Sequence, residues 1–254
     1  GGQVGYYLVS RGAPLGAAGN QAVTAAFYSI SEPGLSLMFD LARQHTTFET
    51  VTDLRHDAVK AGLEEFVPQI CDGLAALEAP LWEVADALNS SGRVLFAAHR
   101  EWPRPDDPLV SAWLAVNCIR EWRADTHWAI QIAEGISGTA AGVLDGAWRS
   151  YDDDWLPRSR GADDDAIAAA TRELDDRGFL TDGRINDDGI AYRQGLEDRL
   201  DSLTAEPWQR LGTDRTAQLQ ALLDEAGPTL LGRIDDTAGP KWMPAGRLHA
   251  RSGI

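Results

Sequence analysis

The segment CIREWRADTHW, residues 118–128, brings guanidinium, carboxylate and imidazole groups together within about three helical turns. Spacings of three and four residues place Arg120, Arg123 and His127 on one face of a helix. Trp113 and other apolar residues on the same helix indicate that this face is partly buried, and a buried cation needs a partner. The planar guanidinium fork suits a carboxylate or phosphate, and the imidazole can act as an acid, base or donor near pH 7.

Three interpretations of this polar face are open. It can form an internal network of arginines with Asp or Glu that joins two domains. It can instead line a pocket, together with His99 and Arg100 of the preceding helix, that accepts an anionic or hydrogen-bonding ligand. It can also be a solvated helix face, which the neighbouring tryptophans disfavour.

Further candidates lie outside this segment. Arg11, in RGAPLG, and Tyr28 stand where a turn and a helix end expose polar groups, although a plain salt bridge and a buried hydroxyl bond would explain them equally. The candidate ligand-binding residues are Arg11, Tyr28, His99, Arg100, Arg120, Trp122, Arg123, Asp125 and His127. His127 is the one candidate catalytic residue, and only if the protein is an enzyme.

No metal site and no cofactor are predicted. His99, Asp125 and His127 could be imagined as ligands, but Asp125 and His127 are two residues apart and face different sides of a helix. Cys71 and Cys118 form no C-x-x-C pair. The sequence also lacks G-x-S-x-G, a Walker loop, H-E-x-x-H, and a G-x-G-x-x-G that follows a strand.

Charge and composition restrict the partners of this 254-residue chain. Its formal net charge is −16, so a polyanion such as nucleic acid is repelled at long range, and nucleic acid is an improbable partner. No apolar run approaches the roughly 20 residues of a membrane span. The N-terminus lacks the features of a secretory signal and a starting Met, so we expect a cytoplasmic protein whose chain begins inside a longer gene product.

The pattern of elements predicts a mainly α protein. Glycines and Pro14 predict a turn over 7–19, and the strongest helical pattern covers 108–134. In the C-terminal part, a helix over 163–177 precedes short strands at 179–181 and 184–186, joined by the tight turn Asp182-Gly183. Another long helix opens after it, at Asp187-Asp188-Gly189.

The charged connector YDDDWLPRSRGADDD, residues 151–165, marks the predicted domain boundary. We therefore expect a helical N-terminal domain, residues 1–150, packed on a C-terminal winged helix with a small β-hairpin wing, residues 151–254.

The stretch AAATRELDDRGFLTDGRINDDGIAYRQGLED resembles the second half of a MarR-type winged helix. The cues RGAPLG, AAFYSI, GRVLFAAHREWPRPDDP, IREWRADTHW, RGFLTDGRIN and EPWQRLG occur in the order typical of an actinobacterial helix-turn-helix family. This resemblance spans nearly the whole chain and implies the fold, a high-GC Gram-positive source and a possible homodimer, but no activity. The sequence departs from the family pattern at Trp122, where a histidine is expected, and at the acid-rich connector 152–165.

The winged helix is a poor candidate for DNA binding. Its helix before the wing would enter the major groove, where a basic surface is needed. Arg172 and Arg177 there are outnumbered by acids at positions 163, 164, 165, 173, 175 and 176. The wing adds further aspartates beside Arg184.

These observations favour a small-molecule-binding protein in specialised metabolism, built on a winged helix that has lost DNA binding. Its ligand would carry an anionic or polar group. The first alternative is a cofactor-independent enzyme of natural-product biosynthesis that uses His127 with Arg120 and Arg123. The second is a MarR-like DNA-binding transcriptional regulator.

Overall fold

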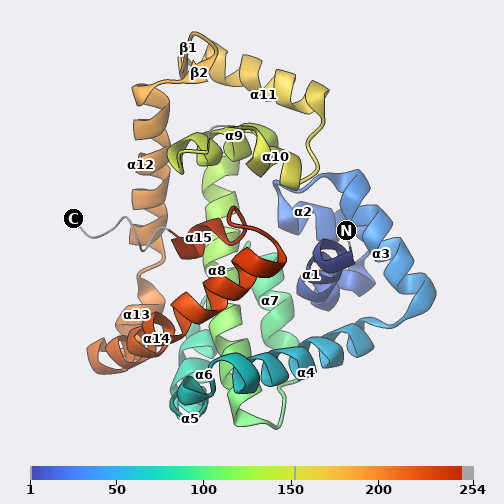
Figure 1. The fold of residues 1–254 in the computed structure, drawn as a ribbon, viewed down its shortest axis with the longest axis vertical. Coiled ribbons are helices and arrows are strands. Elements are labelled where there is room, and N and C mark those ends of the chain that lie inside the picture. The colour runs from blue at the N-terminus through green and yellow to red at the C-terminus, as the bar shows by residue number, and fades with distance from the viewer. Residues whose placement is uncertain (1, 152, 248–254) are drawn as a thin grey trace. The chain divides into compact units, whose positions relative to one another are not determined.

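The computed structural model describes residues 2–151 and 153–247, and these are mainly helical with one small two-stranded antiparallel sheet (Figure 1). The expectation of a mainly α chain is therefore confirmed. The chain divides into two compact units. Unit 1 contains Gly1–Thr52, Ser90–His99 and Glu121–Ala205, and unit 2 contains Asp53–Asn89, Arg100–Arg120 and Glu206–Ile254.

Unit 1 holds the N-terminal helices and the hairpin. Its elements are α1 (Gly2–Gly12), the 3₁₀ helix η1 (Ala13–Ala18), α2 (Asn20–Phe27), α3 (Glu32–His45), α9 (Gly138–Trp148), α10 (Trp155–Ser159), α11 (Asp164–Asp176), β1 (Leu180–Thr181), β2 (Arg184–Ile185) and α12 (Asp187–Leu203).

Unit 2 consists of helices alone within the described residues. Its elements are the 3₁₀ helix η2 (Pro68–Ile70), α5 (Cys71–Ala75), α6 (Glu78–Ala87), α13 (Glu206–Leu211), α14 (Thr213–Thr237) and α15 (Pro244–Arg247). Three helices have residues in both units: α4 (Phe48–Phe66), α7 (Val94–Glu101) and α8 (Pro108–Ala133).

The predicted order of helix, hairpin and helix is present from α11 to α12, in yellow to orange in Figure 1. Gly178, at φ +76°, follows the end of α11 in a left-handed conformation that favours glycine. Asp182 and Gly183 both have positive φ, as a two-residue hairpin turn requires, and Thr181 pairs with Arg184. The side chain of Asn186 then accepts a hydrogen bond from the Gly189 amide and caps α12.

The core beneath this hairpin is shared with the end of α8 and with α9. Leu174 of α11 and Leu200 of α12 are fully buried against Ile130 of α8 and Leu144 of α9. Phe179 and other hairpin residues pack around them. Burial of these side chains, at about 1.5–3 kcal/mol each, holds α8, α9, α11 and α12 in one arrangement.

The expected turn over 7–19 is wrong in its first part, because α1 continues to Gly12 and η1 follows it. Leu8 and Val9 are buried in a second core cluster of unit 1, and this tertiary packing outweighs the local signal of glycines and proline. A Cβ on Gly12 would lie 2.7 Å from the Phe39 ring. Glycine at this position therefore permits close packing of α1 against α3 and does not mark a turn.

The division into domains 1–150 and 151–254 remains a prediction. Unit 1 contains residues from both of them.

Candidate functional site

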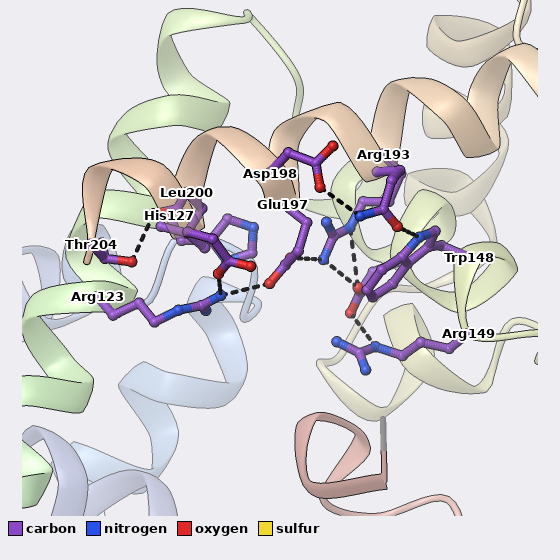
Figure 2. Close-up of polar contacts among 12 residues, drawn as sticks. Arg123, His127, Trp148, Arg149, Arg193, Glu197, Asp198, Leu200 and Thr204 are labelled. Carbon is purple, nitrogen blue, oxygen red and sulfur yellow. Dashed lines mark hydrogen bonds and ion pairs between the residues drawn. The ribbon is translucent and has the colours of Figure 1, made fainter. Parts of the chain in front are cut away.

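The C-terminal half of α8 presents its polar face to α12 within unit 1. Arg123 donates from Nη2 to Oε1 of Glu197, at 2.6 Å, and to Oδ1 of Asp201, at 2.8 Å (Figure 2). Glu197 and Asp201 are one turn apart on α12, so both carboxylates reach the same guanidinium. This pairing agrees with the first of the three interpretations of the polar face, the internal ion-pair network.

Asp145 of α9 is the most heavily shared carboxylate in the network. Its Oδ2 accepts from Nε of Arg149 at 3.1 Å, and its Oδ1 accepts from Nη2 of Arg193 at 2.9 Å. Nη2 of Arg160 lies 3.8 Å from Oδ2. Burial by itself would raise the pKa of Asp145, but the guanidiniums of Arg149, Arg193 and Arg160 hold it below its usual range. Asp145 is therefore a buried anion at neutral pH.

Arg193 of α12 is 2% exposed and connects Asp145 to Glu197 (Figure 2). Its Nη2 lies 2.8 Å from Oε2 of Glu197, and its guanidinium carbon lies 4.4 Å from the centroid of the Trp148 ring. The third nitrogen, Nη1, is buried and has no hydrogen-bond partner among the described residues. A donor of this kind is available to a further acceptor.

His127 lies beside this network and is neutral at physiological pH. Burial and the charge of Arg193 lower the pKa of His127 to about 4, against the opposing effects of Glu197 and Asp145. Its ring stacks on Trp128, with centroids 5.0 Å apart, and its Nε2 lies 2.7 Å from Nε2 of Gln131.

A cavity of about 440 Å³ opens next to the network, which is within the range of small-molecule sites. It lies between the chain segments that follow α2, precede α9 and connect α10 to α11. Its walls combine hydroxyl, aromatic, cationic and small residues: Tyr28, Ser29, Ile30, Ser31, Pro33, Ser137, Gly138, Thr139, Pro157, Arg160, Gly161, Ala162, Asp163 and Ala166.

The first turn of α9 forms one wall of this cavity. Ser137 caps the helix by accepting from the Ala140 amide, and Gly138 and Thr139 follow it. A Cβ on Gly138 would lie 2.6 Å from the carbonyl oxygen of Tyr28, so only glycine lets the two segments approach this closely. The positive end of the α9 dipole thus faces the cavity, where it favours an anion.

Arg160 belongs to both the cavity and the network. It lines the cavity, and about a quarter of its side chain is exposed. Among the described residues Asp145 alone is an acidic group within 4 Å, at 3.8 Å, and Asp145 is already bonded to Arg149 and Arg193. Burial, together with the charges of Arg149 and Arg193, lowers the pKa of Arg160 despite Asp145. A ligand anion would relieve this unfavourable environment.

One acid also lines the cavity. The carboxylate of Asp163 accepts from the Ala166 amide at 2.8 Å and so caps α11.

The predicted site residues of unit 1 do not form a single site, because they take part in several separate contacts. Arg11 is paired in two places with Glu121, from Nε to Oε1 at 2.9 Å and from Nη2 to Oε2 at 2.6 Å. Burial alone would lower the pKa of Arg11, but the Glu121 carboxylate raises it, so this pair is a buried salt bridge. The ring of His99 bonds to the backbone carbonyl of Arg11 at 2.8 Å.

Asp125 and Trp122 also make structural contacts within the protein interior. Asp125 accepts from the Phe96 amide at 2.9 Å, and burial raises its pKa to about 6. Trp122 is 2% exposed, and the Arg93 guanidinium lies 4.4 Å above its ring. Neither side chain lines the cavity.

Arg120 and Arg100 are in unit 2. Arg120 is exposed and contacts Oδ1 of Asn117 at 3.5 Å, and Arg100 donates to the carbonyl of Leu88 at 2.9 Å. Helical spacing placed Arg120, Arg123 and His127 on one face, but α8 passes from one compact unit to the other between residues 120 and 121. Of the predicted residues, only Tyr28 lines the cavity, and Arg123 and His127 lie in the network beside it.

Sequence reasoning missed Asp145, Arg160, Arg193 and Glu197. Asp145 did carry a signal, because it is the one charged residue in the otherwise apolar helix GTAAGVLDGAW. Arg193 and Glu197 are four apart, an ordinary surface pattern, and their burial could not be inferred from spacing. Arg160 lies in the connector 151–165, which the sequence indicated only as a domain boundary.

Metal binding receives no support from the described residues. They contain no group of three or more His, Cys, Asp or Glu side chains that could hold a metal ion.

The comparison with known families places this chain. A model of a helix-turn-helix family matches residues 1–234. The chain belongs to that helix-turn-helix family. No curated protein and no solved structure matches it.

The α11 helix displays acids to solvent. Asp164, Asp165, Asp175 and Asp176 of α11 are all exposed, whereas Arg172 is the one exposed cation on that helix. Arg177, which follows α11, donates to the carbonyl oxygens of Glu134 and Gly135. The solvent-facing surface of α11 is therefore acidic.

None of the described helices combines the length and the apolar character that crossing a bilayer requires.

Replacing Asp145 with Asn should lower the free energy of unfolding by about 3–5 kcal/mol. The change removes a buried negative charge and leaves Arg149 and Arg193 without their shared partner. Urea denaturation followed by tryptophan fluorescence measures the loss. Asp198→Asn, on an exposed residue of α12, is the matched control and should change stability by less than about 0.5 kcal/mol. Equal stability of the two variants would contradict the role given to Asp145.

The low pKa of His127 predicts a loss of stability in acid. Its ordinary pKa is 6.5 and its folded pKa is about 4, so between these values the unfolded chain binds more protons than the folded one. Stability due to His127 is complete above pH 6.5 and declines as the pH falls towards 4. Denaturation of wild type and His127→Gln from pH 7.5 to 4.5 should show the difference between them shrinking. The exposed His45 gives the control variant His45→Gln. NMR titration of His127 near pH 6.5 would overturn the prediction.

Proposed function

We propose that this protein binds a small organic anion in the cavity beside Arg160, on a winged-helix scaffold that does not bind DNA. The observation that carries the proposal is the cavity wall, which joins the first turn of α9 to a guanidinium without a hydrogen bond among the described residues. Both features favour a negative charge at the same place. Tyr28, Ile30 and Pro33 add apolar surface to the cavity lining for the ligand body.

Several parts of this assignment stay predictions. They are the role in specialised metabolism, the actinobacterial source, the likeness to MarR proteins and the possible homodimer.

Catalysis by His127 with Arg120 and Arg123 has weaker support. Arg120 is in unit 2, and Arg123 is already bonded to two carboxylates. A base works best when its pKa is near the working pH, and the pKa of His127 is about 4. Ligand binding in the cavity beside Arg160 requires none of these three residues and no base.

Regulation of genes through DNA contact also has weaker support, although the family is a helix-turn-helix family. A fold of this type does not by itself imply DNA binding. The exposed aspartates of α11 would lie against phosphates, and each would reduce affinity.

Arg160→Gln should weaken the binding of benzoate and phenyl phosphate at least tenfold, because a hydrogen bond to a charged group contributes about 1.5–3 kcal/mol. Titration calorimetry measures the affinity. Arg158→Gln is the matched control: Arg158 is an exposed residue of α10, two positions before Arg160, is paired with Asp164 at 2.8 Å, and does not line the cavity. Equal affinities of the two variants, or no binding of either probe to wild type, would refute the proposal.

Wild-type protein should not shift duplex DNA in an electrophoretic assay at 50 mM salt, where non-specific binding is strongest. A variant with Asp164, Asp165, Asp175 and Asp176 all changed to Lys should produce a shift that disappears at higher salt. That variant shows whether the scaffold could bind DNA if its acids were removed. A shift by the wild-type protein would restore the regulator as the favoured function.

A further inference from the structure

Asp163 is the one acid among the described residues that line the cavity, and its carboxylate is only partly used. Its Oδ1 accepts at 2.8 Å from the amide of Ala166, which lines the same cavity. That amide is the one partner that the described residues give the carboxylate, and no ion pair among them includes Asp163. The negative charge at this part of the cavity wall is therefore not balanced by a cation within ion-pair distance among the described residues.

The capping of α11 does not explain why this residue is charged. Three helices begin at the cavity, and the N-cap residue of each one lines it: Ser31 for α3, Ser137 for α9 and Asp163 for α11. Serine and asparagine cap a helix about as well as aspartate does. The charge of Asp163 is thus additional to its structural role.

Arg160 and Asp163 are the two ends of one continuous segment of the cavity wall. Residues 160–163 all line the cavity, and Gly161 and Ala162 have no side chain beyond Cβ between the two charged residues. Three residues span at most about 11 Å, so both charges border a restricted space. They do not pair with each other, because Asp145, at 3.8 Å, is the one acid within 4 Å of Arg160 among the described residues. The cavity therefore offers a ligand one positive and one negative group, separate but close.

A ligand that pairs with both groups carries two opposite charges of its own. The guanidinium and the first turn of α9 favour a carboxylate, and the Asp163 carboxylate favours an ammonium group, which has three donors. The short segment between Arg160 and Asp163 favours charges on neighbouring atoms, as on the α-carbon of an amino acid. Such a ligand has no net charge, so the net charge of −16 on the chain does not repel it as it repels a simple anion.

We propose that the cavity binds an amino acid with an apolar side chain, whose carboxylate meets Arg160 and whose ammonium group meets Asp163. Tyr28, Ile30 and Pro33 supply apolar lining for that side chain. This inference rests on the proposed function and adds a second charged group to its ligand.

The test compares L-phenylalanine with two analogues that each lack one charge, using calorimetry on the full chain. The analogue 3-phenylpropionate lacks the ammonium group, and 2-phenylethylamine lacks the carboxylate. We expect wild type to bind phenylalanine at least about fivefold more tightly than either analogue, because each analogue leaves one charged group of the cavity without its partner.

Asp163→Asn isolates the effect of the carboxylate, because asparagine keeps the helix cap and removes the charge. The variant should bind phenylalanine at least about fivefold more weakly than wild type. Its affinity for 3-phenylpropionate should be unchanged or higher, since a negative charge near the ligand carboxylate has been removed. A general loss of folding would weaken both ligands, so the different responses identify a direct contact.

Two further variants complete the test. Asp165→Asn is the matched control: it removes the same charge from the first turn of α11, but Asp165 is exposed and does not line the cavity. This control should keep the wild-type preference for phenylalanine. Asp163→Ser, which introduces the capping residue that α3 and α9 already use, repeats the test if Asp163→Asn fails to fold.

The outcomes separate this inference from the proposed function. Binding of 3-phenylpropionate that depends on Arg160, without a preference for phenylalanine, would overturn the inference and leave the proposed function standing. Asp163 would then only cap α11. Equal binding of phenylalanine and 2-phenylethylamine would also overturn the inference, as would a preference for phenylalanine that survives both changes at Asp163. Failure of phenylalanine, 3-phenylpropionate, benzoate and phenyl phosphate alike would overturn both.

Discussion

The buried carboxylate of Asp145 is the interaction on which the rest of this structure depends. One anion on α9 holds Arg149, which follows the end of that helix, Arg193 of α12 and, at longer range, Arg160 of the loop after α10. A carboxylate inside a protein is stable only when it is paired, and three guanidiniums keep it ionised. Because Asp145 is shared, its distance to Arg160 is 3.8 Å, longer than a hydrogen bond. Asp145 therefore influences both the packing of the helices and the charge at the cavity.

In the proposed function, packing and ligand binding use different ends of the same network. Arg123 of α8 is paired with Glu197 and Asp201 of α12, and Arg193 of α12 is paired with Asp145 of α9, so these ion pairs brace α12 against both helices. Arg160 is the member of the network that lines the cavity, and the first turn of α9 lines the same cavity. A site held in place by buried ion pairs would bind a small molecule with a smaller loss of conformational entropy, which is consistent with the proposed function.

The chain belongs to a helix-turn-helix family, and membership of such a family does not by itself imply DNA binding. The α11 helix and the hairpin have the expected order, yet their solvent face carries aspartates where a DNA reader carries arginines. A scaffold whose charges repel a polyanion can retain the same hydrophobic core.

The sequence by itself determined the local elements. Periodicity placed the long helix α8, and turn chemistry at Asp182 and Gly183 placed the hairpin, because these depend on neighbouring residues alone. Its net charge also pointed away from DNA. Only the tertiary structure decided which cations are paired and which are available. Arg123 and Arg120 look alike on a helical wheel, but the partners of Arg123 lie about 75 residues away, and no local spacing reveals which acid a buried arginine will meet.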